Sequence, residues 1–148
     1  MEFKKICVVG LGYIGLPTAS TFATHGIKVV GVDNNPQVVK SLQNGDVHIY
    51  EPGLRALVET ALQTGNLSIS AQPEPADAFI VCVPTPFYED KRADMRAVTS
   101  ATRSIVPHLR KGSLVMLEST SPPQTTTNLV RPILEQSGLT AGVDFHLA

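Results

Sequence analysis

The sequence is poor in the residues that carry metal, disulfide or nucleophilic chemistry. It contains two cysteines and no Cys-x-x-Cys pair, which excludes a disulfide framework and gives no zinc or dithiol site. Cys7 and Cys82 both lie in apolar runs, which favours buried, unreactive thiols. The four histidines are far apart and form no pair with ligand spacing, so we predict no metal site. There is also no G-x-S-x-G motif, no Walker phosphate loop and no internal repeat.

The sequence also lacks an excess of positive or negative charge, and it lacks an apolar run that could cross a membrane. Lys and Arg number 12 against 13 for Asp and Glu, and they are scattered, so we expect neither nucleic acid nor an anionic membrane as a partner. Residues 6–24 carry no charge and follow Lys4-Lys5, as in a signal peptide. Three glycines, a proline and several hydroxyl residues make this stretch too polar for a hydrocarbon core. We therefore expect a cytoplasmic protein.

The most informative feature present is a glycine-rich turn near the N-terminus. Residues 3–9, which end in the apolar run 6–9, predict a buried strand, and it leads into Gly10-x-Gly12-x-x-Gly15. In dinucleotide-binding folds the first glycine permits the tight turn, the second lets a pyrophosphate approach the backbone, and the third lets the next helix pack closely. The amides and dipole of that helix then face the phosphates. The motif predicts dinucleotide binding, provided that a strand, a helix and an acidic residue surround it at the right distances.

The following segment meets this condition. Residues 16–23 are small and suit a helix packed closely on a sheet, and residues 27–32 form a second β-rich run. Asp33 ends that run, eighteen residues after Gly15, where such folds place the acid that accepts hydrogen bonds from the adenosine ribose. A carboxylate at this position repels a 2′-phosphate, which favours NAD over NADP as the cofactor. A role for Asp33 as the cap of the next helix is compatible with this one and stays open.

The rest of the chain alternates strands and helices over a single domain, 1–148. We expect further strands at 67–70, 78–83, 114–117 and 143–147. We expect helices at 37–42, 54–62 and 125–136, and one that Asp94 caps and that runs to 105. Six strands with intervening helices predict the α/β class, as a doubly wound parallel sheet (Rossmann fold) with helices on both faces and strand order 3-2-1-4-5-6.

Hydroxyl residues follow two of the predicted strands. Thr85 lies between two prolines after the strand 78–83, and Thr120 follows the strand 114–117. The carboxyl ends of parallel strands share one rim of the sheet, where open α/β folds bind ligands. These threonines, and Thr126 further along, are candidates to contact a cofactor, but turn or cap roles explain them equally well.

The chain resembles one known family in five motifs. They read GLGYIGLP (10–17), GVD (31–33), EPGL (51–54), VPTPF (83–87) and ESTSPP (118–123). The family is that of the UDP-glucose/GDP-mannose dehydrogenases, and the chain is similar to its N-terminal NAD-binding domain along nearly its whole length. VPTPF with a short charged loop and Asp94-Met95 after it, together with ESTSPP, is most similar to the UDP-N-acetyl-D-mannosamine dehydrogenase branch.

The resemblance implies an enzyme that oxidises the C6 hydroxyl of a nucleotide sugar to a carboxylate with two NAD. In this family the reaction proceeds in four steps. They are a hydride transfer, capture of the aldehyde by a cysteine, a second hydride transfer and hydrolysis of the thioester. By position, the resemblance implies cofactor contacts from Gly10, Gly12, Tyr13, Ile14, Gly15, Asp33, Thr85, Thr120 and Thr126. It implies that Glu118 supports its loop rather than acting as a base. Gln124 stands where many members have a glycine, which makes the contact of Thr126 less certain.

The resemblance also defines what the chain lacks. The nucleophilic cysteine and catalytic lysine of the family lie beyond position 148, so this chain is expected to hold no catalytic residue and to bind NAD without turnover. A UDP-sugar would bind only through the missing half, which also selects N-acetylmannosamine, N-acetylglucosamine or glucose. Family members dimerise through a central helical segment, so we expect the full-length parent to be a homodimer. A non-catalytic NAD-sensing module and an S-adenosylmethionine methyltransferase, which also has a glycine-rich turn, stay open as alternatives.

Overall fold

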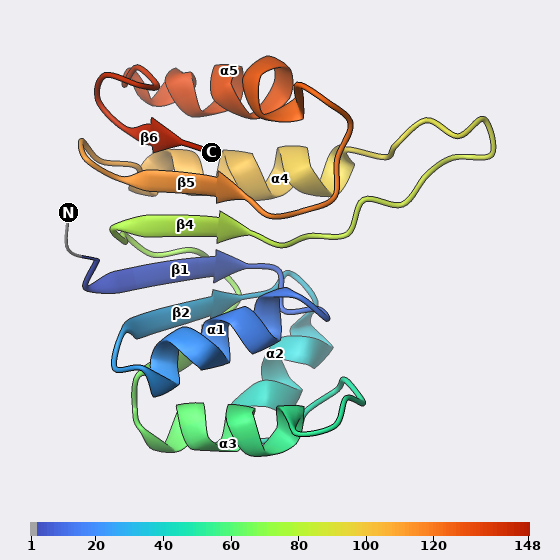
Figure 1. Cartoon of the computed structure of the whole chain (residues 1–148), viewed down its shortest axis with the longest axis vertical. Helices are drawn as coiled ribbons and strands as arrows, with labels where there is room; N and C mark the ends of the chain where they lie inside the picture. Colours follow the sequence, from blue (N-terminus) through green and yellow to red (C-terminus); the bar gives the residue numbers. More distant parts are fainter. Residues whose placement is uncertain (1–2) are drawn as a thin grey trace.

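The computed structural model describes residues 3–148 and contains one six-stranded sheet. All strands are parallel, in the order β3-β2-β1-β4-β5-β6. They are β1 (Lys5–Val9), β2 (Lys28–Val32), β3 (Leu67–Ser70), β4 (Ala78–Val81), β5 (Leu114–Leu117) and β6 (His146–Leu147). Figure 1 shows the labelled strands pointing the same way, so that their carboxyl ends form one edge of the sheet. The predicted doubly wound α/β fold and its strand order are confirmed.

Helices connect the strands and cover both faces of the sheet (Figure 1). They are α1 (Gly15–Thr24), α2 (Pro36–Gln43), α3 (Leu54–Gln63), α4 (Arg96–Ile105) and α5 (Arg131–Leu134), with the short elements η1 (Val106–His108), η2 (Thr126–Val130) and η3 (Glu135–Ser137). None of the helices formed by residues 3–148 has the length and apolar character that a membrane crossing requires.

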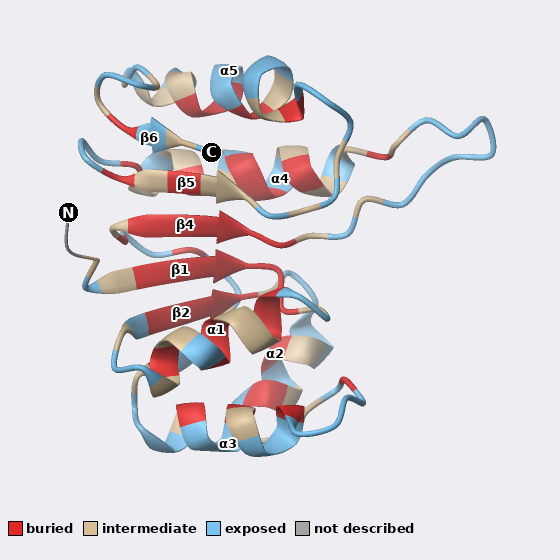
Figure 2. Ribbon diagram, viewed as in Figure 1, coloured by how far each residue is buried: buried red, intermediate tan, exposed pale blue. Residues whose placement is uncertain are grey.

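Side chains of the central strands alternate between two hydrophobic cores, one on each face of the sheet. In β1, Ile6 and Val8 pack with residues of α1 and α3, whereas Cys7 and Val9 pack with residues of α4 and α5. Figure 2 shows that the central strands and the inner sides of the helices are buried, while most loops are exposed. Burial on both faces explains why these strands read as continuous apolar runs in the sequence.

Two central strands are shorter than predicted. β1 begins at Lys5 rather than at Phe3, because the carboxylate of Asp77 accepts hydrogen bonds from the amides of Lys4 and Lys5, both at 2.9 Å. These two amide bonds hold the pKa of Asp77 below its usual range. β4 ends at Val81, two residues before the predicted end.

The last strand is also shorter than the predicted range of 143–147. β6 contains only His146 and Leu147. The preceding residues form a turn in which the amides of Val143 and Asp144 donate to the carbonyl oxygen of Thr140, at 3.2 and 2.8 Å. Val143 is 82% exposed, so the apolar residue that suggested a longer strand does not join the core. The prediction was wrong because a local turn satisfies these amides before the strand begins.

The predicted helix over 125–136 is confirmed in extent, since residues 125–137 are helical without interruption, but the type of helical turn changes along it. A π-helical turn, η2, comes first, α5 follows, and the 3₁₀ turn η3 ends the segment. Pro132 explains the change of turn type, since its ring has no N–H and would collide in a regular α-helix with the carbonyl of the residue four positions earlier. The wider π turn immediately before it relieves this collision.

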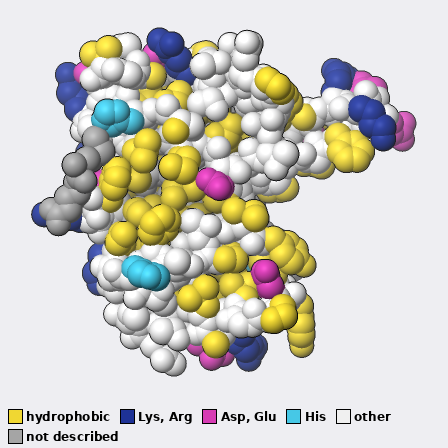
Figure 3. All heavy atoms as spheres, viewed as in Figure 1, with side chains coloured by type: hydrophobic (Ala, Val, Ile, Leu, Met, Phe, Trp, Pro, Cys, Tyr) yellow, Lys and Arg dark blue, Asp and Glu magenta, His cyan; other side chains and the backbone are white. Residues whose placement is uncertain are grey.

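A long arm, residues 84–95, separates β4 from α4. It turns back on itself at an antiparallel bridge between Phe87 and Ala93 and projects away from the body of the domain (Figures 1 and 3). Its far end carries both basic and acidic side chains. At its base, Asp94 accepts a hydrogen bond from the amide of Arg96 at 3.0 Å and so supports the start of α4, although Met95 holds the N-cap position.

Candidate functional site

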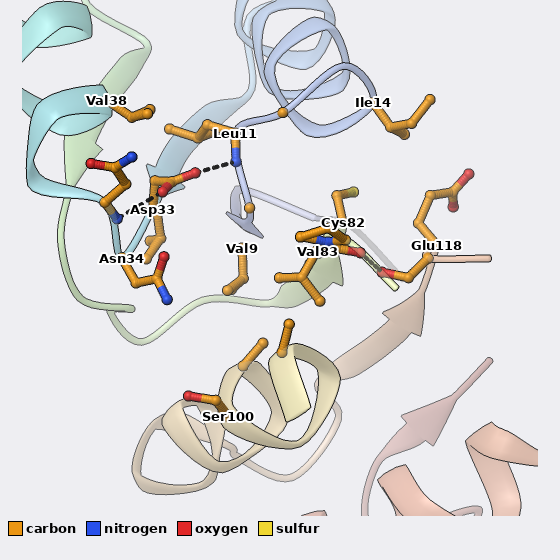
Figure 4. A pocket seen from close by; sticks show the side chains of 18 of the residues that line it. Val9, Leu11, Ile14, Asp33, Asn34, Val38, Cys82, Val83, Ser100 and Glu118 are labelled. Carbon is orange, nitrogen blue, oxygen red and sulfur yellow. Dashed lines mark hydrogen bonds between the residues drawn. The ribbon is translucent and has the colours of Figure 1, made fainter. Parts of the chain in front are cut away.

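A cavity of about 730 Å³ lies at the carboxyl edge of the sheet. Its walls come from the loops that follow β1 to β5 and from one face of α4. Seven of the nine residues that the sequence predicted as cofactor contacts line it: Gly10, Gly12, Tyr13, Ile14, Asp33, Thr85 and Thr120. Figure 4 shows Asp33 and Glu118 on opposite sides of this cavity. A cavity of this size is typical of sites for small molecules and cofactors.

The first and third glycines of the turn are fixed by packing within the fold. The amide of Gly10 donates to the carbonyl oxygen of Val32 at 2.7 Å, and its φ of +98° favours glycine. A Cβ on Gly10 would lie 2.5 Å from the carbonyl oxygen of Cys82, and a Cβ on Gly15 would lie 1.8 Å from that of Gly10. Gly15 is buried and does not line the cavity, so its role is to let α1 approach β1.

The second glycine has no such reason within the fold. A Cβ on Gly12 would meet nothing within 4 Å, and its φ lies outside the left-handed region. The neighbouring Tyr13 and Ile14 are 68% and 57% exposed, and α1 begins at Gly15 with no side-chain cap. The amides of Leu16 and Thr18 already donate to the carbonyl oxygens of Gly12 and Ile14, and residue 17 is a proline without an N–H. The amides left for an anion are therefore those of the turn itself, residues 12–15, and the space above Gly12 admits one. These residues fit the pyrophosphate of a dinucleotide.

Two backbone amides orient the carboxylate of Asp33. One carboxylate oxygen accepts from the amide of Leu11 at 3.0 Å and the other from the amide of Asn35 at 2.9 Å (Figure 4). The side chain of Asn35, and not that of Asp33, caps α2 by accepting from the amide of Gln37 at 3.0 Å. Because each carboxylate oxygen has two lone pairs, Asp33 keeps acceptor capacity on the cavity side. This fits a ribose that donates two hydroxyl hydrogen bonds.

The loops after β4 and β5 are joined by hydroxyl groups. The hydroxyl of Thr85 donates to the carbonyl oxygen of Thr120, and that of Ser119 donates to the carbonyl oxygen of Val83 at 2.8 Å. The structure thus brings Thr85 and Thr120 together on one wall of the cavity. The Thr85 hydroxyl keeps its lone pairs, and the Thr120 hydroxyl takes no part in these two bonds. Both threonines can therefore still contact a cofactor.

The structure does not bring Thr126 to the cavity. It is half-buried at the start of η2, and the residues that line the cavity do not include it. Gln124, which stands where the resemblance expects a glycine, has a φ of +67°. Gln124 thus adopts the left-handed conformation, which glycine adopts most easily.

The sequence did not reveal several further residues in the walls. Ala97, Ser100 and Ser104 lie at helical spacing on one face of α4, next to the buried face that the apolar pattern revealed. His48 and Gln72 enter from the loops before α3 and after β3. The small size of the α4 residues was the available signal, because a helix needs small side chains where a flat ligand packs against it.

Neither cysteine offers a reactive thiolate. Burial raises the pKa of the Cys7 thiol to about 11, and burial together with the nearby Glu118 carboxylate raises that of Cys82 to about 12. Both are protonated at neutral pH, whereas covalent catalysis requires a thiolate. Cys82 lies one residue beyond β4 and lines the cavity, so the prediction that placed it inside a strand was wrong.

This arrangement defines a class of protein. A sheet of this order, with a glycine turn opening onto the N-terminus of α1 and an acid after β2, is that of a dinucleotide-binding domain. The chain belongs to the UDP-glucose/GDP-mannose dehydrogenase family, whose NAD-binding domain is matched by residues 4–148. NAD is therefore its cofactor, and the methyltransferase alternative is excluded.

Relatives in this family share both sequence and structure with the chain. The UDP-N-acetyl-D-mannosamine dehydrogenase of Methanococcus maripaludis is 50% identical over 136 residues, which cover 89% of this chain and 32% of the relative. The NDP-N-acetyl-D-galactosaminuronic acid dehydrogenase of Ralstonia nicotianae is 48% identical over 129 residues, covering 87% and 30%. The crystal structure of the UDP-N-acetyl-mannosamine dehydrogenase of Staphylococcus aureus is 47% identical, with a TM-score of 0.91 and coverage of 95% and 35%. The chain thus spans about a third of the length of these relatives.

Proposed function

We propose that this chain is the NAD-binding part of a longer nucleotide-sugar 6-dehydrogenase, and that its substrate is UDP-N-acetyl-D-mannosamine. The reaction converts the C6 hydroxyl to a carboxylate with two NAD. The observation that carries the proposal is the 50% identity to the Methanococcus maripaludis enzyme of that name over 89% of the chain. The structural likeness to the Staphylococcus aureus enzyme supports it, since the relation extends to the whole fold.

Different residues of the cavity bind different parts of NAD. Gly12 leaves space for the pyrophosphate, the amides of the turn at residues 12–15 donate to it, and Asp33 accepts hydrogen bonds from the adenosine ribose. Thr85 and Thr120 lie on the wall formed by the loops after β4 and β5, which we assign to the nicotinamide end. When bound, NAD supplies the hydride acceptor of the reaction.

The proposal assigns the covalent chemistry to residues outside this chain. The two thiols within it are buried and have raised pKa values, so they are poor nucleophiles. We therefore propose that the chain alone binds NAD but oxidises no UDP-sugar. We further propose that the intact enzyme is a cytoplasmic homodimer.

A second candidate substrate is another UDP-hexosamine or UDP-glucose. The enzyme from Ralstonia nicotianae, whose name specifies a different N-acetylated sugar acid, is 48% identical to the chain. A domain so similar in enzymes of different specificity does not itself select the sugar. The substrate thus has to be decided by experiment.

The experiment compares nucleotide sugars with the intact enzyme and with this chain alone. NADH formation is followed with UDP-N-acetylmannosamine, UDP-N-acetylglucosamine, UDP-N-acetylgalactosamine and UDP-glucose. We expect the highest kcat/KM with the first sugar, with two NADH formed per sugar, and no NADH from the chain alone. A higher kcat/KM with another sugar would reassign the substrate. Turnover by the chain alone would contradict the assignment of catalysis to residues outside it.

A further inference from the structure

The loop between α2 and α3 places a histidine in the wall of the cofactor cavity. Along residues 47–50 the side chains alternate: Val47 and Ile49 pack into the core that α1 and α3 share with the sheet, and Ile49 is only 7% exposed. His48 and Tyr50 are exposed. Alternation of this kind is the geometry of extended backbone, and it turns His48 away from the core, so that its side chain lines the cavity.

The loop is held at both of its ends. The amide of Asp46 donates to the carbonyl oxygen of Ser41 at 2.8 Å, close to the end of α2. The amide of Leu54 donates to the carbonyl oxygen of Glu51 at 3.2 Å, and Leu54 is buried at the start of α3. These two bonds, with the packing of Val47 and Ile49, hold the backbone on both sides of His48.

His48 is distinctive because of the charges around the cavity. The walls carry the carboxylates of Asp33 and Glu118, and among the described residues that line the cavity there is no lysine or arginine. His48 is the one basic side chain in this set. The pyrophosphate of a dinucleotide carries two negative charges, and the backbone amides of α1 supply only partial positive charge. An imidazole donates an N–H in either tautomer and carries a full charge when protonated.

We propose that His48 is a cofactor-binding residue whose imidazole donates a hydrogen bond to the phosphate of the adenylate half of NAD. The assignment to this half follows from the element that precedes His48, because its loop continues from α2 and its neighbour Val47 packs against the same core as Val38 of α2. Asn34 and Val38, which line the cavity, lie on the Asp33 side in Figure 4, whereas Glu118 lies on the far side. The inference rests on the proposed function in one respect, namely that Asp33 marks the adenosine end.

The test is a calorimetric titration of this chain with NAD, ADP-ribose, AMP, adenosine and nicotinamide mononucleotide. His48→Ala is expected to weaken NAD, ADP-ribose and AMP by about tenfold and to leave adenosine and nicotinamide mononucleotide unchanged. His48→Gln, which keeps a neutral donor, is expected to lose less. His25→Gln is the matched control, because His25 is an exposed histidine at the C-terminal end of α1, away from the glycine turn.

The possible outcomes separate this inference from the proposed function. If the unaltered chain does not bind NAD, the proposed function fails. If the unaltered chain binds NAD and His48→Ala binds it equally well, the role of His48 is refuted while the proposed function stands. An equal loss for adenosine and AMP would refute the phosphate contact, since the interaction would then be with the sugar or the base. A loss for nicotinamide mononucleotide would refute the assignment to the adenylate half.

Discussion

Substitution of the second glycine separates the requirements of the cofactor from those of the fold. Gly12→Ala adds one methyl group at a position where nothing lies within 4 Å and where φ is not left-handed. Ala loses less chain entropy than Gly on folding, so we expect the free energy of unfolding to change by less than about 1 kcal/mol, toward greater stability. The same methyl group occupies the space where the pyrophosphate would lie. We expect NAD affinity to fall by at least about tenfold, which corresponds to about 1.4 kcal/mol.

The other two glycines of the turn provide the contrast. In Gly15→Ala the new Cβ would lie 1.8 Å from the carbonyl oxygen of Gly10, and in Gly10→Ala it would lie 2.5 Å from that of Cys82. Both contacts are with backbone, which no change of rotamer can relieve. We expect each variant to lose about 2 kcal/mol or more of stability, at the upper range for overpacked cores or beyond it.

Urea denaturation and calorimetric titration with NAD measure the two effects on the same samples. We expect Gly12→Ala to be stable and weak in NAD binding, and Gly15→Ala to be destabilised. Affinity for NAD in Gly12→Ala equal to that of the unaltered chain would refute the position of the pyrophosphate. A large loss of stability in the same variant would refute the open space above Gly12.

Three further predictions concern single side chains and pH. Ser20→Ala is expected to raise the free energy of unfolding by about 1 kcal/mol in urea denaturation, because the Ser20 hydroxyl is buried without a hydrogen-bond partner within the described residues; a loss of stability would contradict this. Gln124→Gly is expected to raise it by about 0.5 kcal/mol by relieving the left-handed φ, whereas Gln124→Ala, which keeps that φ, should give no gain. Stability should fall as the pH rises from about 9 toward 11, since the unfolded thiols of Cys7 and Cys82 ionise while the folded ones, with pKa values of about 11 and 12, stay protonated. The double substitution to Ala should reduce this slope in urea denaturation at each pH, and an unchanged slope would show that other groups cause it.

Much of the fold was predictable because its main signals are local. Strands such as β1 and β4 are continuous apolar runs, and the glycine turn and Asp33 occur at distances that a parallel sheet converts into one site. The strand order followed from this class of fold and needed no information on individual contacts.

The parts that failed depend on contacts that the sequence does not display. The extent of β6 depends on hydrogen bonds to Thr140, and the π turn before α5 depends on how the chain accommodates Pro132. His48 and Ser100 line the cavity, but each comes from a segment that is remote in the sequence from the glycine motif. No local pattern distinguishes His48 from an ordinary loop residue, and the small size of the α4 residues is a signal only once the neighbouring site is known.

The most direct test of the account is a thermal-shift titration of this chain with NAD, NADP, S-adenosylmethionine and UDP-N-acetylmannosamine. A ligand present at about 100 times its dissociation constant adds about 2.7 kcal/mol to the free energy of unfolding, which gives a clear rise in the melting temperature. The account predicts this rise with NAD, a smaller one with NADP because of Asp33, and none with the other two ligands. No rise with NAD, or an equal rise with NADP, would contradict the site built on the glycine turn and Asp33.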